Sequence, residues 1–129
     1  MKQLLLVPIL LILLAIPANA GEALPDPAIQ KKFVGQWVRT DGGYVIHVRE
    51  IKPDGSVDAG YFNPKPINVS EANVSVWKGF DQLYIKLEDK GYPGSTYKLY
   101  YYAEKDQLAG FYYQAAVKET YEVLFIRKK

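Results

Sequence analysis

The chain has 129 residues and a formal net charge of +2, with 16 Lys or Arg residues against 14 Asp or Glu residues. These charges are interspersed and form no basic stripe, so we expect no nucleic-acid partner. Cysteine is absent, which excludes disulfides, thiol catalysis, zinc–cysteine sites and iron–sulfur clusters.

Residues 1–20 have the order of segments of a secretory signal peptide. Lys2 supplies a positive start, an apolar run extends from Leu4 to Ile16, and Ala18-Asn19-Ala20 is a small-residue cleavage site. The alternative, a retained membrane anchor, is disfavoured because a spanning helix needs roughly 20 apolar residues. The lack of cysteine excludes a lipid-anchored lipoprotein. We therefore predict cleavage after Ala20, export to the periplasm or the extracellular medium, and no stable membrane anchor afterwards.

The mature chain begins with a lead-in at residues 21–32, followed by a single domain at residues 33–129. Asp26-Pro27 is a typical N-cap and first-turn pair, which predicts a short helical turn over 27–32. Eight strand-like segments with alternating apolar and polar residues follow. They span residues 33–40, 44–51, 56–63, 72–78, 82–88, 95–103, 107–114 and 120–127.

Short turns join most of these segments. Lys52-Pro53-Asp54-Gly55 has Pro and Gly at favoured turn positions, and residues 89–94 form a loop rich in Gly and Pro. Asn63-Pro64-Lys65-Pro66 is expected to interrupt strand pairing, because proline has no backbone N–H to donate. The spacing predicts an all-β fold, an eight-stranded antiparallel up-and-down barrel, since closure removes exposed edges. A two-sheet sandwich is the structural alternative.

Three residues give the chain a family resemblance. Gly35-Gln36-Trp37 opens the first strand after the helical turn, and Arg127 ends the last strand. This arrangement resembles the calycin superfamily of lipocalins, avidin-like proteins and small bacterial protease inhibitors. The resemblance implies that Trp37 packs at the closed end of the barrel, with Arg127 across its ring in a cation–π contact. Gly35 would then allow close backbone approach beside the tryptophan.

The chain also departs from that family. It is shorter than a typical lipocalin, lacks the Thr-Asp-Tyr block, and has no tryptophan set that matches a biotin site. It is also similar to uncharacterised bacterial secreted proteins that carry an Asn-Pro-x-Pro stretch, here residues 63–66. Neither similarity brings a function with it, so the function must be argued from the residues.

The strongest compositional feature is the set of 11 tyrosines. Aromatic residues suit a pleated, half-buried surface, so cross-strand packing alone explains many of them. On the segments 95–103 and 107–114 aromatic residues occupy both faces, which predicts that one set fills the interior and the other lies outside. The leading hypothesis is a non-enzymatic barrel that binds a small apolar or aromatic ligand in its open end. The residues predicted to line that end are Tyr44, Tyr61, Tyr97, Tyr101 and Tyr121.

An inhibitor or interaction module is the alternative. It would bind an envelope or extracellular protein through the loops at residues 63–66 and 89–96. An enzyme ranks last, because the single histidine, His47, has no evident catalytic partner and the adjacent Glu88 and Asp89 point to opposite faces of a strand. The sequence shows no cluster of metal ligands, so we predict neither a metal site nor a cofactor.

Overall fold

The computed structural model describes residues 23–129, so the predicted signal peptide at residues 1–20 lies outside the described residues. One short helix, α2 (Pro27–Phe33), precedes the strands. The Asp26 side chain caps it by accepting a hydrogen bond from the Ala28 N–H at 3.1 Å, and Pro27 occupies the first turn. The predicted helical turn is therefore confirmed and extends to Phe33. Nothing helical in residues 23–129 has the length and apolar character needed to span a membrane.

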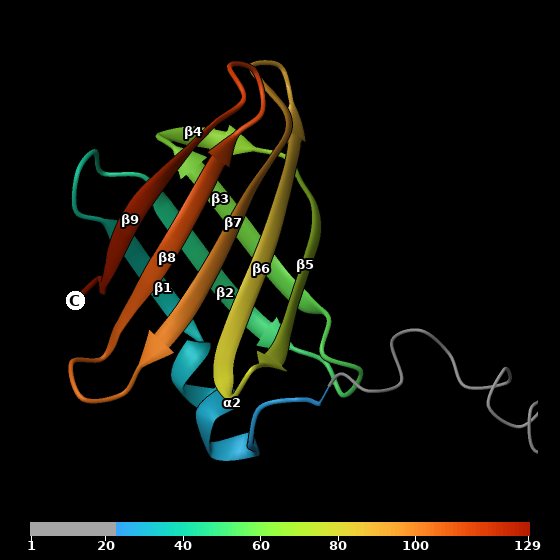
Figure 1. The fold of residues 1–129 in the computed structure, drawn as a ribbon, viewed down its shortest axis with the longest axis vertical. Coiled ribbons are helices and arrows are strands. Elements are labelled where there is room, and N and C mark those ends of the chain that lie inside the picture. Colours follow the sequence, from blue (N-terminus) through green and yellow to red (C-terminus); the bar gives the residue numbers. More distant parts are fainter. Residues whose placement is uncertain (1–22) are drawn as a thin grey trace, which may run out of the picture.

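Nine antiparallel strands form a single sheet (Figure 1). Along the sheet their order is β4-β3-β2-β1-β9-β8-β7-β6-β5. Their bounds are β1 Gly35–Arg39, β2 Val45–Ile51, β3 Val57–Asn63, β4 Lys65–Ile67, β5 Val69–Trp77, β6 Phe80–Asp89, β7 Tyr92–Tyr102, β8 Gln107–Gln114 and β9 Glu119–Arg127. The continuous sheet favours the barrel over the sandwich.

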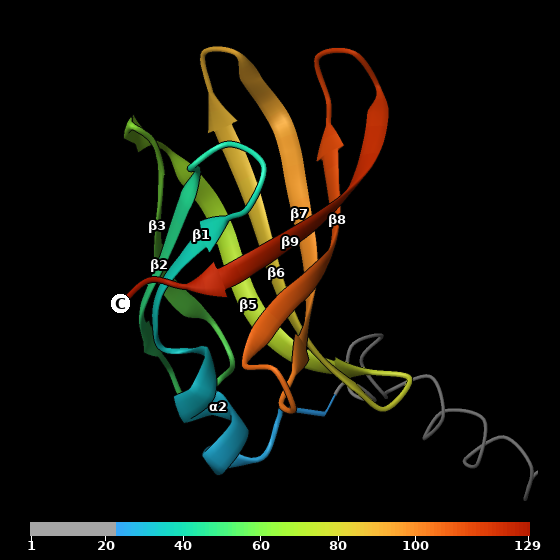
Figure 2. The ribbon, with the colours of Figure 1, turned by 90° about the vertical axis from the view of Figure 1, so that its left-hand side faces the viewer.

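The sheet curls until its two edges approach each other, giving a nearly closed barrel (Figure 2). The Val74 N–H donates to the Gly55 carbonyl at 2.8 Å, and Ser56 forms an isolated bridge with Asn73. At the opposite side the first and last strands pair directly, with Trp37 opposite Arg127. Closure thus satisfies backbone groups that an open sheet would leave exposed.

Two predicted boundaries were wrong. Residues 63–66 do not break the sheet, because Lys65–Ile67 forms β4 and pairs with β3 through Phe62 opposite Pro66. Proline is tolerated there because β4 is an edge strand, whose outer side needs no donor. The predicted loop at 89–94 is a two-residue turn, and Pro93 lies near a register shift at the start of β7. The structure therefore has nine strands where eight were predicted.

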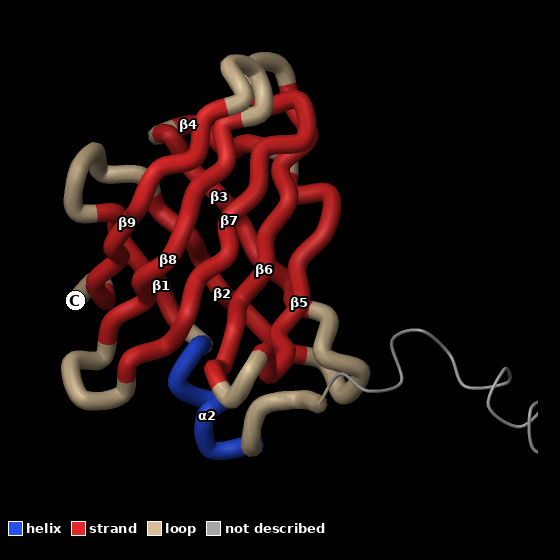
Figure 3. The backbone as a smooth tube through the Cα atoms, in the orientation of Figure 1, coloured by secondary structure: helices blue, strands red, loops and turns tan. Residues whose placement is uncertain are grey.

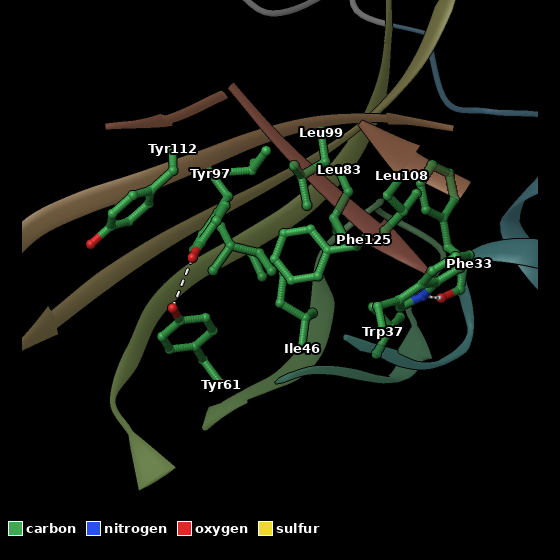
Figure 4. Close-up of a cluster of buried hydrophobic side chains, with 14 of the residues drawn as sticks. Phe33, Trp37, Ile46, Tyr61, Leu83, Tyr97, Leu99, Leu108, Tyr112 and Phe125 are labelled. Carbon is green, nitrogen blue, oxygen red and sulfur yellow. Dashed lines mark hydrogen bonds between the residues drawn. The ribbon is translucent and has the colours of Figure 1, made fainter. Parts of the chain in front are cut away.

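Large apolar side chains fill the interior from the helical end to the middle of the barrel (Figure 4). They alternate with outward residues along each strand, as the pleat requires. The fully buried members with the largest side chains include Phe33, Trp37, Ile46, Leu83, Leu99, Leu108 and Phe125. This part of the barrel is a packed core, and Tyr61, Tyr97 and Tyr112 lie between it and the end opposite α2.

Gly110 marks a close approach between β8 and β7. A Cβ at this position would overlap the backbone carbonyl oxygen of Lys98, and a backbone atom cannot move as a side chain can. We expect Gly110→Ala to lower the free energy of unfolding by about 1–3 kcal/mol, the usual cost of overpacking. Gly60→Ala is the control, because a Cβ there first meets the flexible end of Arg49. Denaturant unfolding in which both variants lose equal stability would contradict this account.

Arg127 joins the last strand to the first strand and to α2 at the helical end of the barrel. Its guanidinium lies 4.2 Å from the centroid of the Trp37 ring and donates to the carbonyls of Val34 (2.9 Å) and Lys32 (2.6 Å). The Trp37 indole donates to the Phe33 carbonyl at 2.9 Å. One arginine thus holds α2, β1 and β9 together.

Two further residues complete this end. Gly35 has a φ of +136°, and a Cβ on it would come within 2.7 Å of the Arg127 guanidinium. The carboxylate of Asp106 accepts from Arg127 at 2.7 and 2.9 Å, and this hydrogen bonding lowers the pKa of Asp106 to about 2. Gly35 therefore leaves room for the cation, and Asp106 neutralises it.

Candidate functional site

The tube trace shows the end of the barrel that lies opposite α2 (Figure 3). Hairpins β6–β7 and β8–β9 rise at this end, and the connection between β1 and β2 lies on the same side. We call the hollow at this end the tyrosine mouth. It has a volume of about 660 Å³, within the 300–1,000 Å³ usual for small-molecule pockets. The lining residues are Arg39, Asp41, Tyr44, Tyr61, Gly91, Tyr92, Tyr112, Gln114, Tyr121 and Glu122.

Strand register explains why these residues converge. Tyr97 on β7 lies opposite Tyr112 on β8, and Tyr112 lies opposite Tyr121 on β9. Opposed residues of neighbouring strands point to the same face, so all three rings face inward. The rings of Tyr97 and Tyr112 stack with centroids 4.5 Å apart, and those of Tyr112 and Tyr121 stack at 6.5 Å. A row of aromatic faces thus extends from the interior to the rim.

Tyr44 and Tyr61 form the opposite wall. Their rings are nearly parallel, 7° apart, with centroids separated by 6.3 Å. To admit a third ring between them, two parallel rings must be about 7–8 Å apart, which is twice the usual contact distance between carbon atoms. A ligand would therefore lie against the exposed faces of the tyrosines and would not be sandwiched within this pair.

Arg39 is the cation of the tyrosine mouth, and its side chain is only 12% exposed. Its guanidinium lies 4.1 Å from the centroid of the Tyr44 ring and 5.5 Å from that of Tyr112. It donates to both carboxylate oxygens of Asp41 and, at 2.9 Å, to the Tyr97 hydroxyl. Burial alone would disfavour its charge, but these hydrogen bonds outweigh burial and keep the pKa of Arg39 above its ordinary value.

The hydroxyls of Tyr61 and Tyr97 meet at the floor of the mouth, 2.8 Å apart (Figure 4). Both residues are almost fully buried, with exposed fractions of 1% and 0%. Burial raises the pKa of Tyr97 to about 12 and also raises that of Tyr61. The pair is therefore neutral over the physiological pH range, and it separates the hollow from the packed core beneath.

The structure brings together four of the five tyrosines predicted from the sequence. Tyr44, Tyr61 and Tyr121 line the mouth, and Tyr97 lies directly beneath it. Tyr101 does not join them. Its hydroxyl donates to Asp106 at 2.9 Å, and its ring packs on Phe33 with centroids 5.7 Å apart, at the helical end of the barrel.

Seven of the ten lining residues are not among the predicted ligand-binding residues, and Arg39, Tyr92 and Tyr112 are the most important of them. Tyr92 falls in the loop predicted at residues 89–94, and no role is predicted from the sequence for Arg39 or Tyr112. The signal for Arg39 was present in the sequence, because Arg39 is in phase with the buried Trp37 on the first strand and must therefore lie inside the barrel or at its rim. The register that brings Tyr112 over Tyr97 became known only from the structure.

Metal-binding side chains do not gather in the described part of the chain. Residues 23–129 contain no group of three or more His, Asp or Glu side chains arranged to hold a metal ion. His47 lies on β2 between the buried residues Ile46 and Val48, so its side chain points to the outer surface. Asp41 is held by Arg39, whose hydrogen bond lowers the pKa of this carboxyl and makes it a poor proton donor at neutral pH.

Comparisons with family models, curated proteins and solved structures gave no match to this chain. The resemblance to calycins therefore remains a prediction, and the functional argument depends on the geometry of the tyrosine mouth.

Proposed function

We propose that this protein is a non-enzymatic binding protein that holds a small apolar or aromatic ligand in the tyrosine mouth. The supporting observation is a hollow of about 660 Å³ whose ten lining residues include five tyrosines and one arginine with a side chain only 12% exposed. Ligand sites typically combine an apolar, aromatic lining with a few well-placed polar groups, and the mouth has both. We further propose that the protein acts after export, in the periplasm or the extracellular medium, as the signal-peptide pattern predicts.

Tyr121 offers the most direct test of this function. The residue is 44% exposed and its side chain faces the mouth, so truncation would remove contact area for a ligand at little cost in stability. We expect Tyr121→Ala to weaken the binding of a neutral planar probe such as 2-acetylnaphthalene about fivefold to tenfold, as the loss of one stacked ring would. The dissociation constant can be measured by NMR titration of the tyrosine ring resonances.

The matched control is Tyr113→Ala. Tyr113 is 37% exposed and lies on β8 next to Tyr112, so it points to the outside of the barrel. Its removal should leave the affinity unchanged. Equal weakening by the two variants, or probe-induced shifts confined to resonances of the outer face, would contradict binding in the mouth.

A protein-binding module remains the second candidate, and one observation favours it. On the outer face Trp77, Phe80, Tyr102 and Phe111 are each about half exposed, with fractions of 46–50%. Exposed aromatic residues are enriched at protein interfaces. The loops predicted for this role are shorter than expected, since most of residues 63–66 and 92–96 lie in strands. Any interface would therefore use the outer wall.

A photo-reactive amino acid at Phe111 would test this second candidate in cells that export the protein. A discrete cross-linked adduct at Phe111, absent when the same group replaces Asn73 on β5, would support an interface. Equal labelling at both positions would indicate random collision and would count against it.

A further inference from the structure

A chain of hydrogen bonds leads from the buried cation to the floor of the tyrosine mouth. The Arg39 guanidinium donates to the Tyr97 hydroxyl at 2.9 Å, and that hydroxyl lies 2.8 Å from the hydroxyl of Tyr61. Arg39 and Tyr61 belong to the lining of the hollow, although Tyr61 is only 1% exposed, and Tyr97 is fully buried beneath it. This hydrogen-bond chain therefore has one end at a fixed positive charge and the other at a residue of the lining.

Counting the hydrogens in this hydrogen-bond chain shows that one hydroxyl donor has no acceptor. Two hydroxyls carry two hydrogens, and a single hydrogen bond between them uses only one. The guanidinium has no acceptor to offer, so its bond to Tyr97 consumes a lone pair and no hydroxyl hydrogen. Within residues 23–129 neither hydroxyl has a further protein acceptor, so one donor remains unused.

The direction of the hydrogen bond between the two hydroxyls determines which tyrosine carries this unused donor. If Tyr97 donates to Tyr61, the free hydrogen is on Tyr61, which lines the hollow. An acceptor on a ligand would favour this arrangement, because each bond of a chain that starts at a cation polarises the next. The floor of the mouth would then present a strengthened O–H donor.

The charges around the hollow indicate a neutral acceptor. Asp41 already binds Arg39 through both carboxylate oxygens, so the positive charge of the guanidinium is neutralised. A carboxylate on the ligand would have to compete with Asp41 for the guanidinium. A carbonyl or similar neutral oxygen needs only the free hydroxyl of Tyr61.

From these contacts we infer that the ligand is a neutral, planar aromatic molecule bearing a hydrogen-bond acceptor such as a ketone, aldehyde or quinone oxygen. This inference rests on the proposed function and specifies the chemistry of the same site. The ring lies on the exposed tyrosine faces, and the acceptor oxygen takes the Tyr61 hydrogen at the end of the chain from Arg39.

Three probes with the same ring test this inference: naphthalene, 2-acetylnaphthalene and 2-naphthoate. We expect the full-length mature protein to bind 2-acetylnaphthalene about tenfold more tightly than either of the others, by NMR titration. This factor corresponds to one good hydrogen bond formed in a site shielded from water. Naphthalene binding as tightly as the ketone, or 2-naphthoate binding most tightly, would overturn the inference while leaving the proposed function intact. If none of the three shifted the resonances of the mouth, the proposed function itself would fail.

Tyr61→Phe tests the role of the terminal hydroxyl. The variant should lose the roughly tenfold preference for 2-acetylnaphthalene over naphthalene. Tyr113→Phe removes a hydroxyl from the outer face and should keep the full preference. A preference that survives in Tyr61→Phe would overturn the assignment of the donor.

Discussion

Replacing Trp37 by alanine is expected to lower the free energy of unfolding by about 3–5 kcal/mol. The indole is fully buried, packs against Tyr101 with ring centroids 6.4 Å apart, and lies beneath the Arg127 guanidinium. Truncation would leave a cavity at the helical end of the barrel and remove the donor that binds the Phe33 carbonyl. Because α2 is held to the barrel by this contact, the helix should also lose protection in amide hydrogen exchange.

The second tryptophan provides a control within the same chain. Trp77 is 49% exposed and lies at the end of β5, so Trp77→Ala should cost less than about 1 kcal/mol. Urea unfolding followed by circular dichroism gives both values on one scale. If Trp37→Ala were nearly neutral, or if the two substitutions cost the same, Trp37 would not have the closing role described here.

The paired hydroxyls of Tyr61 and Tyr97 are expected to make stability fall steeply in alkali. Both pKa values are raised by burial, that of Tyr97 to about 12, whereas an unfolded tyrosine ionises near 10. A group with a raised folded pKa contributes its full stability below the unfolded pKa and loses it as pH rises through the folded value. From pH 9 to pH 11 the free energy of unfolding should therefore fall by about 1.4 kcal/mol for each tyrosine, and by about 3 kcal/mol for the pair.

Other groups also titrate in this range, so the comparison must be made between variants. The difference in unfolding free energy between wild type and Tyr61→Phe should shrink by about 1.4 kcal/mol from pH 9 to pH 11, since the variant has one buried hydroxyl fewer. Tyr113→Phe, at an exposed position on the outer face, is the matched control variant. A pH-independent difference for Tyr61→Phe would mean that this hydroxyl ionises freely in the folded protein.

Alternation of apolar and polar residues was sufficient to predict most of the barrel. Segments such as β6 and β9 have a two-residue period that specifies both the strand and its buried face, and the structure has strands there. The errors occurred at prolines. Pro66 and Pro93 were expected to end pairing, but each lies where the missing N–H is not needed, on an edge strand or near a register shift.

The candidate site was harder to predict, because strand phase fixes the face of a residue but not its height along the barrel. Tyr97 and Tyr101 share the inner face of β7, yet four residues along a strand correspond to about 13 Å. That distance separates the tyrosine mouth from the helical end. The position of Arg39 depended on the pairing of β1 with β9, two strands distant in sequence, and that of Tyr112 on the register of the β7–β8 hairpin. The order of residues alone specifies neither.

The pairing of β1 with β9 also has a consequence for the order of folding. Arg39, at the rim of the mouth, lies opposite Phe125, so contacts between strands at opposite ends of the domain complete the pocket wall. Such distant contacts form late, because the entropy of closing a long loop must be overcome first. The tyrosine mouth therefore does not exist in any partly folded chain that lacks a docked β9. A ligand would be loaded only after folding is complete, and it would stabilise the finished barrel without guiding its assembly.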